Sequence, residues 1–158
     1  GRGSENKVPF VAAVQTDQAH HPRFAVLTPV KAFTRAEIKK WSQNHLAAQA
    51  CVLSDSLDCF KAIDSVCQHM VYNIKKEGDA LVDTEFKWVN TLLSNVKTAF
   101  SGALHAFNFH KYSRRYLGNM QFRFNHRFDL KDCFYEVSHS AVITSPKPAK
   151  LLFSVLSG

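Results

Sequence analysis

Residues 50–55, Ala-Cys-Val-Leu-Ser-Asp, decide the fold class of this chain. Ala50 to Leu53 form a short apolar run that stops at the polar pair Ser54 and Asp55, and helical patterns lie on both sides of it. An apolar run of this length between two helices is typical of a buried strand in a parallel sheet. The stretch therefore predicts an α/β protein.

A hairpin and a helix are expected before this strand. The apolar segments 8–16 (VPFVAAVQT) and 23–30 (RFAVLTPV) predict two strands, with a turn at DQAHHP between them. Pro29 places the end of the second strand near a sheet edge. Thr34 and Glu37 have the spacing of a capping box and predict a helix start. The residues expected on the inward face of that helix are Ile38, Trp41, His45 and Leu46.

The rest of the chain predicts one more strand and several helices. A short helix over 57–67 and a strand over 70–74 are followed by a polar loop and by helices over 84–99, 110–125 and 130–139. This order predicts a mixed α/β layered fold. The length of 158 residues fits one domain, which we place at 1–140 with a tail at 141–158.

All of the net positive charge lies in one stretch. The chain carries 20 Lys and Arg against 13 Asp and Glu, a net charge of +7. Residues 86–128 contain no acidic residue, and their basic residues are Lys87, Lys97, Lys111, Arg114, Arg115, Arg123 and Arg127. A block of one sign with interleaved aromatic residues indicates a phosphate-rich partner, although a solvated basic surface has the same pattern.

Other sequence features narrow the class of protein. No apolar run approaches the length of a membrane span, and no signal peptide precedes the first strand. The four cysteines form no CxxC pair, which argues against a zinc site and favours buried free thiols. His105, His110 and His126 lack the spacing of metal ligands.

Three polar residues have positions that suit a site. Asp55 ends the predicted parallel strand, where ligands and metals gather in α/β proteins; capping the next helix is the alternative role. Asn90 and Lys97 are seven residues apart and share one face of the helix over 84–99. Glu85 would lie about 140° around that helix from Asn90, so the two are not expected to serve one site.

The helix over 110–125 has a cationic side and an aromatic stripe. Lys111 and Arg115 are one turn apart with Arg114 adjacent, an arrangement that suits phosphate groups. Aromatic and apolar residues recur every four positions, and a core stripe is favoured over a base-stacking platform for them. They are Tyr112, Tyr116, Met120 and Phe124, with Leu117 beside them.

Several segments together resemble a known family. They are GRGSENKVP at the start, VLSDS around Asp55, His69 before a strand, FKWVNTLLSNVK at 86–97 and SGALHAFNFHKYSRRYLGNMQFRFNHRF at 101–128. Over roughly residues 1–130 the chain is similar to the catalytic domain of bacterial insertion-sequence transposases of the ISXO-like type.

The resemblance implies a ribonuclease-H-like fold with a DDE-type active site. Asp55 matches the second acid of that site, and Asn90 and Lys97 match the variant with Asn in place of the final Glu and Lys seven residues later. The family's first catalytic Asp and the strand that carries it are expected before Gly1. After the second acid this chain has DSLDCF where the family usually has DGxxxY.

The resemblance also implies a function. It is DNA transposition, by cleavage and transfer of DNA strands at the ends of an insertion sequence. Two magnesium ions are expected in a complete site, with Asp55 and Asn90 as ligands here, and weak binding and little activity are expected from this chain alone. The expected partners are double-stranded DNA and further copies of the chain, in the nucleoid-associated cytoplasm of a bacterium and away from membranes.

Two other functions compete with transposition. One is a non-catalytic nucleic-acid-binding module that keeps Lys87, Lys111, Arg114, Arg115, Arg123 and Arg127 as its DNA contacts. The other is a plain interaction domain with a solvated charged surface. A further enzymatic interpretation is a ribonuclease-H-like nuclease that uses Asp55 and Glu85. The angle between Glu85 and Asn90 around the helix disfavours it.

Overall fold

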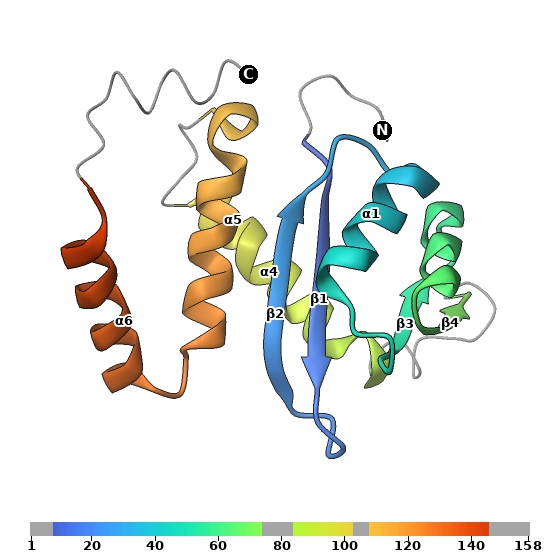
Figure 1. Ribbon diagram of the computed structural model, residues 1–158, viewed down its shortest axis with the longest axis horizontal. Coiled ribbons are helices and arrows are strands. Elements are labelled where there is room, and N and C mark those ends of the chain that lie inside the picture. The colour runs from blue at the N-terminus through green and yellow to red at the C-terminus, as the bar shows by residue number, and fades with distance from the viewer. Residues whose placement is uncertain (1–7, 74–83, 103–107, 146–158) are drawn as a thin grey trace.

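The computed structural model describes residues 8–73, 84–102 and 108–145 (Figure 1). Its elements are, in order, β1 (Phe10–Thr16), β2 (Pro22–Pro29), α1 (Arg35–His45), β3 (Cys51–Asp55), the 3-10 helix η1 (Asp58–Ser65), β4 (Gln68–Tyr72), α4 (Lys87–Ser101), α5 (Phe109–Asn125) and α6 (Leu130–Ile143). The mixed α/β class is confirmed. The first segment of the family resemblance, most of the polar loop before α4, His105 and most of the predicted tail lie outside the described residues.

β1 and β2 form the predicted antiparallel hairpin. Their register pairs Val11 with Thr28 and Ala13 with Val26. The turn is organised by Asp17, whose Oδ1 accepts the N–H groups of Ala19 at 3.0 Å and His21 at 2.9 Å. A short acidic side chain closes such turns by bonding to the backbone a few residues further on, which accounts for the loop of more than two residues.

β3 and β4 form a separate parallel pair, which confirms that the strand at 50–55 is parallel and identifies its partner, Gln68–Tyr72. Asp55 lies opposite Tyr72 at the end of this pair. The expectation that β3 is deeply buried is wrong, because Cys51 is exposed and Ser54 is its only buried residue. The physical reason is that β3 has a strand on one side only within the described part of the chain, so its other edge stays uncovered.

The core consists of two clusters, one on each face of the hairpin. Alternate residues of a strand point to opposite faces, so β1 and β2 supply both. One face packs on α1 and η1, through Val11, Ile38, Trp41, Cys59, Ile63 and Cys67. The other packs on α4 and α5, through Ala25, Leu27, Leu92, Val96 and Leu117. Figure 1 shows the resulting layers, with α4 passing behind the two strands and α1 on the side of β3 and β4.

The predicted helix start at Thr34 is confirmed, but only half of the capping box forms. Thr34 Oγ1 accepts the N–H of Glu37 at 3.3 Å. The Glu37 carboxylate accepts the N–H of Lys31 at 3.4 Å instead of returning to the cap residue. The helix is therefore tied to the end of the hairpin as well as capped.

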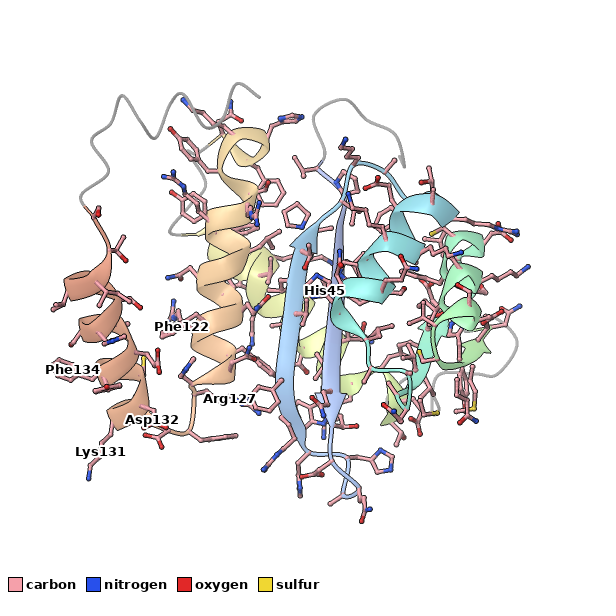
Figure 2. The ribbon with its side chains drawn as sticks, in the orientation of Figure 1. His45, Phe122, Arg127, Lys131, Asp132 and Phe134 are labelled. Atoms are coloured by element: carbon pink, nitrogen blue, oxygen red, sulfur yellow. The ribbon has the colours of Figure 1, made fainter. Side chains whose placement is uncertain are left out.

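The predicted inward face of α1 is wrong at one residue. His45 is exposed, with its ring 5.3 Å from that of Trp41 (Figure 2). Ser42 takes the inward position and satisfies its hydroxyl by donating to the Ile38 carbonyl at 2.7 Å. The helix ends at His45, and the chain turns away before that ring can enter the core.

α4 begins later than predicted. Thr84 and Glu85 are helical, but Phe86 is not, with φ −98° and ψ 4°, and the regular helix starts at Lys87. The angle of about 140° between Glu85 and Asn90 assumed one continuous helix, so that argument does not apply to this structure. The position of Glu85 in the sequence is therefore no longer a reason to exclude it from a site that contains Asn90.

α5 covers the outer edge of β2 with two amide side chains. Asn125 Oδ1 accepts the N–H of Ala25 at 2.7 Å, and its Nδ2 donates to the Ala25 carbonyl at 3.1 Å. Gln121 Oε1 accepts the N–H of Leu27 at 2.9 Å. These bonds satisfy backbone groups that an edge strand otherwise leaves unpaired.

α6 differs from the other helices in having no buried side chain. It runs to Ile143, four residues beyond the predicted end, and it crosses the predicted domain boundary at residue 140. None of the described helices combines the length and apolarity that a bilayer span needs. None of the four cysteines forms a disulfide bond. Cys59 and Cys67 are buried as expected, whereas Cys51 is exposed.

Candidate nucleic-acid and catalytic site

Asp55 lies at the end of β3 and is half-buried. Its Oδ1 accepts the N–H of Leu57 at 3.2 Å, and Leu57 is the residue that begins η1. The local capping role considered from the sequence is therefore present. This bond uses one acceptor position of one carboxylate oxygen, and the remaining acceptor positions of the carboxylate can still bind a ligand.

A short series of contacts connects Asp55 to the first turn of α4. Tyr72, the register partner of Asp55, has its ring 6.2 Å from that of Phe86 in an edge-to-face arrangement. The Phe86 carbonyl accepts the N–H of Asn90 at 2.9 Å. The end of the parallel pair and the start of α4 are thus neighbours.

The start of α4 is also tied to the hairpin. The Trp88 indole N–H donates to the His20 carbonyl at 2.7 Å. His20 has a positive φ of 58° and lies in the hairpin turn, where its N–H donates to the Asp17 carbonyl at 3.0 Å. Contacts to β4 and to the hairpin turn therefore meet within three residues of the chain, Phe86 to Trp88.

Asn90 and Lys97 are both exposed on α4. By helix geometry they are about 20° apart around the axis and about 10 Å apart along it. Lys97 is therefore two turns further from Phe86 than Asn90 is. The convergence of Asp55, Asn90 and Lys97 on one centre stays a prediction.

The residues described here supply few ligands for magnesium. No group of three His, Cys, Asp or Glu residues that could hold a metal ion occurs within 8–73, 84–102 and 108–145. Asp55 offers one carboxylate with an oxygen already bonded to Leu57, and Asn90 offers a neutral oxygen. Two divalent cations need several anionic oxygen donors, so this set by itself does not make a two-metal site.

A buried network beside Asp55 was missed in the sequence. His69 Nε2 is 2.8 Å from Ser54 Oγ, and His69 Nδ1 is 2.5 Å from Asp64 Oδ1. The His69 side chain is 0% exposed, whereas that of Asp64 is 62% exposed. In the parallel register His69 pairs with Val52, and Ser54 lies two residues further on the same face, a proximity that appears only once the pairing of the two strands is known.

The basic residues lie on one layer of the molecule. Lys87 and Lys97 belong to α4, and Lys111, Arg114, Arg115 and Arg123 belong to α5, the two helices that share one face of the hairpin. Lys87 lies over the Trp88 ring at 5.1 Å and Lys111 over the Tyr112 ring at 5.3 Å. Of the predicted stripe, Met120 and Phe124 pack on the cluster around the fully buried Leu117, and the Tyr116 ring lies 6.4 Å from that of Phe100, which packs on the same cluster.

Arg127 has a different environment from the other cations. Its guanidinium donates to the carbonyls of Phe124, at 2.6 Å, and of Pro22, and it lies 4.1 Å from the Phe124 ring centroid and 4.4 Å from that of Phe128. Partial burial, and then the charge of Arg23, lower its pKa. Arg127 therefore fastens the end of α5 to β2, a structural role that the sequence did not indicate. Its DNA contact stays a prediction.

The two histidines of this layer that the structure describes have ordinary surroundings. His110 is exposed at the start of α5. The His126 ring stacks on Phe122 at 4.1 Å, and its Nδ1–H donates to the Phe122 carbonyl at 2.9 Å. Neither belongs to a group of potential metal ligands among the described residues.

The comparison with protein families completes this picture. A family model that matches most of the chain identifies it as an insertion-element transposase domain of the DDE superfamily. The chain belongs to the family of ISXO2-like transposase domains, whose model matches residues 1–125. Neither the curated proteins nor the solved structures include a significant match.

Proposed function

We propose that this chain takes part in DNA transposition by binding duplex DNA along α4 and α5 and presenting Asp55, Asn90 and Lys97 to the DNA backbone. The observation that carries the proposal is the gathering of basic side chains on one layer, with no acidic residue between Lys87 and Phe128. Lys and Arg on one surface attract phosphates irrespective of base sequence. The ends of an insertion sequence are the substrate that the family implies.

Each proposed site residue has a chemical role. Strand cleavage and transfer are in-line displacements at phosphorus, in which negative charge develops on the phosphoryl oxygens. Asp55 supplies an anionic oxygen for a divalent cation, Asn90 a neutral one, and Lys97 a positive charge for a phosphate. With one carboxylate in this set, we expect weak magnesium binding and little cleavage by the purified chain.

The two small sheets support a ribonuclease-H-like arrangement that is completed by one more strand. β1 and β3 each have one strand partner in the described part of the chain, and residues of both pack on the cluster around α1. In Figure 1, β1 is the hairpin strand on the β3 side. The buried indole N–H of Trp41 in this cluster has no acceptor among the described residues, as expected of an incomplete core.

Salt-dependent DNA binding tests the proposal. The logarithm of the affinity for a duplex should fall linearly with the logarithm of salt concentration, with a slope of about −0.9 for each phosphate contact. Replacing Arg114 and Arg115 together by Ala should reduce that slope by about 2. Lys39→Ala with Lys40→Ala on α1 is the matched control, since it removes the same charge from the opposite layer. Equal effects of the two double variants would contradict the proposed surface.

The alternative function is a non-catalytic nucleic-acid-binding module. Because the proposed site has a single carboxylate, DNA binding without cleavage is favoured as the activity of this chain in isolation. A nicking assay with magnesium separates the two when it is run on this chain and on a longer form that includes coding sequence before Gly1. Cleavage that appears only in the longer form, and is lost in Asp55→Asn, supports the transposase reading. A longer form that binds DNA without cleaving it supports the module.

A further inference from the structure

A small pocket lies where the hairpin turn meets the end of α5, about 180 Å³ in volume. Its lining consists of Pro22, Arg23, Phe24, Asn125, Arg127 and Phe128. Figure 2 shows Arg127 at this junction, between the lower end of α5 and β2. The volume is below the range of about 300–1,000 Å³ typical of pockets that enclose drug-sized ligands, so a ligand of that size can be held here only in part, with the rest lying outside the pocket.

The pocket combines two positive charges. The guanidinium groups of Arg23 and Arg127 act on each other, and the charge of Arg23 contributes to the lowered pKa of Arg127. Among the described residues, no carboxylate lies within ion-pair distance of either group, and the Asp17 carboxylate of the hairpin turn acts on Arg23 from further away. Two like charges at one pocket are relieved by an anion between them, and a phosphate suits the planar donors of arginine.

The same pocket has two exposed aromatic rings. Phe24 is 57% exposed and Phe128 is 87% exposed, so both rings are open to solvent beside the two arginines. Arg127 lies over the Phe128 ring and is held by the Pro22 and Phe124 carbonyls, so its position is fixed before any ligand arrives. A site that is already ordered loses less entropy when it binds.

We propose that this pocket binds one unpaired nucleotide of DNA, with its phosphate between Arg23 and Arg127 and its base against Phe24 and Phe128. An aromatic ring stacks on any base whose face is free, and the bases of an intact duplex have no free face. The inference rests on the proposed function in one respect, namely that the polymer is DNA. It adds that the protein distinguishes an unpaired end from a closed duplex.

Binding to three labelled DNA probes tests this inference. The probes are a blunt duplex, the same duplex with a short single-stranded overhang, and that overhang with its bases removed but its phosphates kept. Fluorescence anisotropy should show tighter binding to the overhang than to the other two probes. Phe128→Leu, which keeps an apolar side chain but loses the ring, should weaken binding of the overhang by roughly 5- to 150-fold, the range for one stacked base, and leave the blunt duplex unchanged.

Three further variants make the test specific. Phe128→Trp keeps a ring and should retain overhang binding, and Arg23→Ala should weaken overhang binding with or without bases. Phe134→Leu is the matched control, because Phe134 is 76% exposed on α6, away from the pocket (Figure 2). The inference is overturned if the base-free overhang binds as well as the complete one, or if Phe128→Leu weakens all probes equally. Failure of every probe to bind would overturn the proposed function as well, whereas salt-dependent binding to all three without preference overturns this inference alone.

Discussion

Asn125 holds the backbone of Ala25 with both atoms of its amide, at 2.7 and 3.1 Å, across a separation of one hundred residues in the chain. An amide side chain presents one donor and one acceptor, as a neighbouring strand does. α5 therefore takes the place of a strand at the outer edge of β2. The edge that is most exposed to pairing with another chain is thereby covered.

Asn125→Ala should destabilise the protein by about 1–3 kcal/mol, because it leaves the N–H and carbonyl of the nearly inaccessible Ala25 without their partners. The free energy of unfolding in urea measures the change. Asn119→Ala on the exposed side of the same helix is the control and should cost less than about 0.5 kcal/mol. Equal costs for the two variants would mean that water replaces Asn125 as the hydrogen-bond partner of the Ala25 backbone.

His69→Ala should lower the free energy of unfolding by about 2–4 kcal/mol. It creates a cavity where a fully inaccessible side chain stood and removes the partner of Ser54. Asp64→Asn is the comparison: Asp64 is 62% exposed, so its loss of charge should cost less than about 1 kcal/mol. A cost for Asp64→Asn as large as that for His69→Ala would contradict the view that burial of the imidazole dominates.

The contribution of the Asp58 carboxylate to stability should depend on pH. Hydrogen bonds from Arg35, and then from Lys61, lower the pKa of Asp58 from 3.8 to about 2. A group whose pKa is lower in the folded state stabilises the fold above its unfolded pKa and loses that effect as the pH falls through its folded pKa. The urea midpoint of the natural chain should therefore exceed that of Asp58→Asn at neutral pH, and the difference should fade between pH 3.8 and about 2. If the two urea midpoints still differ at a pH of about 2, the Asp58 side chain stabilises the fold through packing and not through its charge.

Asn90→Asp should strengthen magnesium binding if Asn90 and Asp55 face one centre. A second carboxylate adds a hard anionic ligand, and each tenfold gain in affinity adds up to about 1.4 kcal/mol of stability at saturating ion concentrations. The measurement is the shift of the thermal midpoint on adding magnesium. Asn95→Asp makes the same change about 140° around the helix and should give no such shift. The shift should also disappear in Asn90→Asp combined with Asp55→Asn.

Local patterns in the sequence predicted most of the secondary structure. Asp17 marked the turn and Thr34 the start of α1, because each bonds to its own neighbourhood and needs no distant partner. The short apolar run between helices predicted that β3 is a parallel strand, but not that β4 is its partner. The break at Phe86 was missed because its cause is tertiary: Phe86 contacts Tyr72, and nothing in the residues around it interrupts a helical pattern.

The candidate site was predictable in part. The charge pattern singled out the basic residues of α4 and α5, and the family resemblance singled out Asp55; the roles of these residues stay predictions. The bonds of His69 to Ser54 and Asp64, and of Arg127 to the backbone of β2, were not found, because each depends on segments that meet only after folding. Arg127 is the clearest example, because the charge of an arginine does not show whether its side chain contacts DNA at the surface or bonds to the backbone of its own chain.

The meeting of two anchors within residues 86–88 gives this segment a mechanical role. Phe86 is attached to the parallel pair and Trp88 to the hairpin turn, so three consecutive residues form a joint between the two halves of the molecule. A movement of one half relative to the other would therefore have to be accommodated within these three residues.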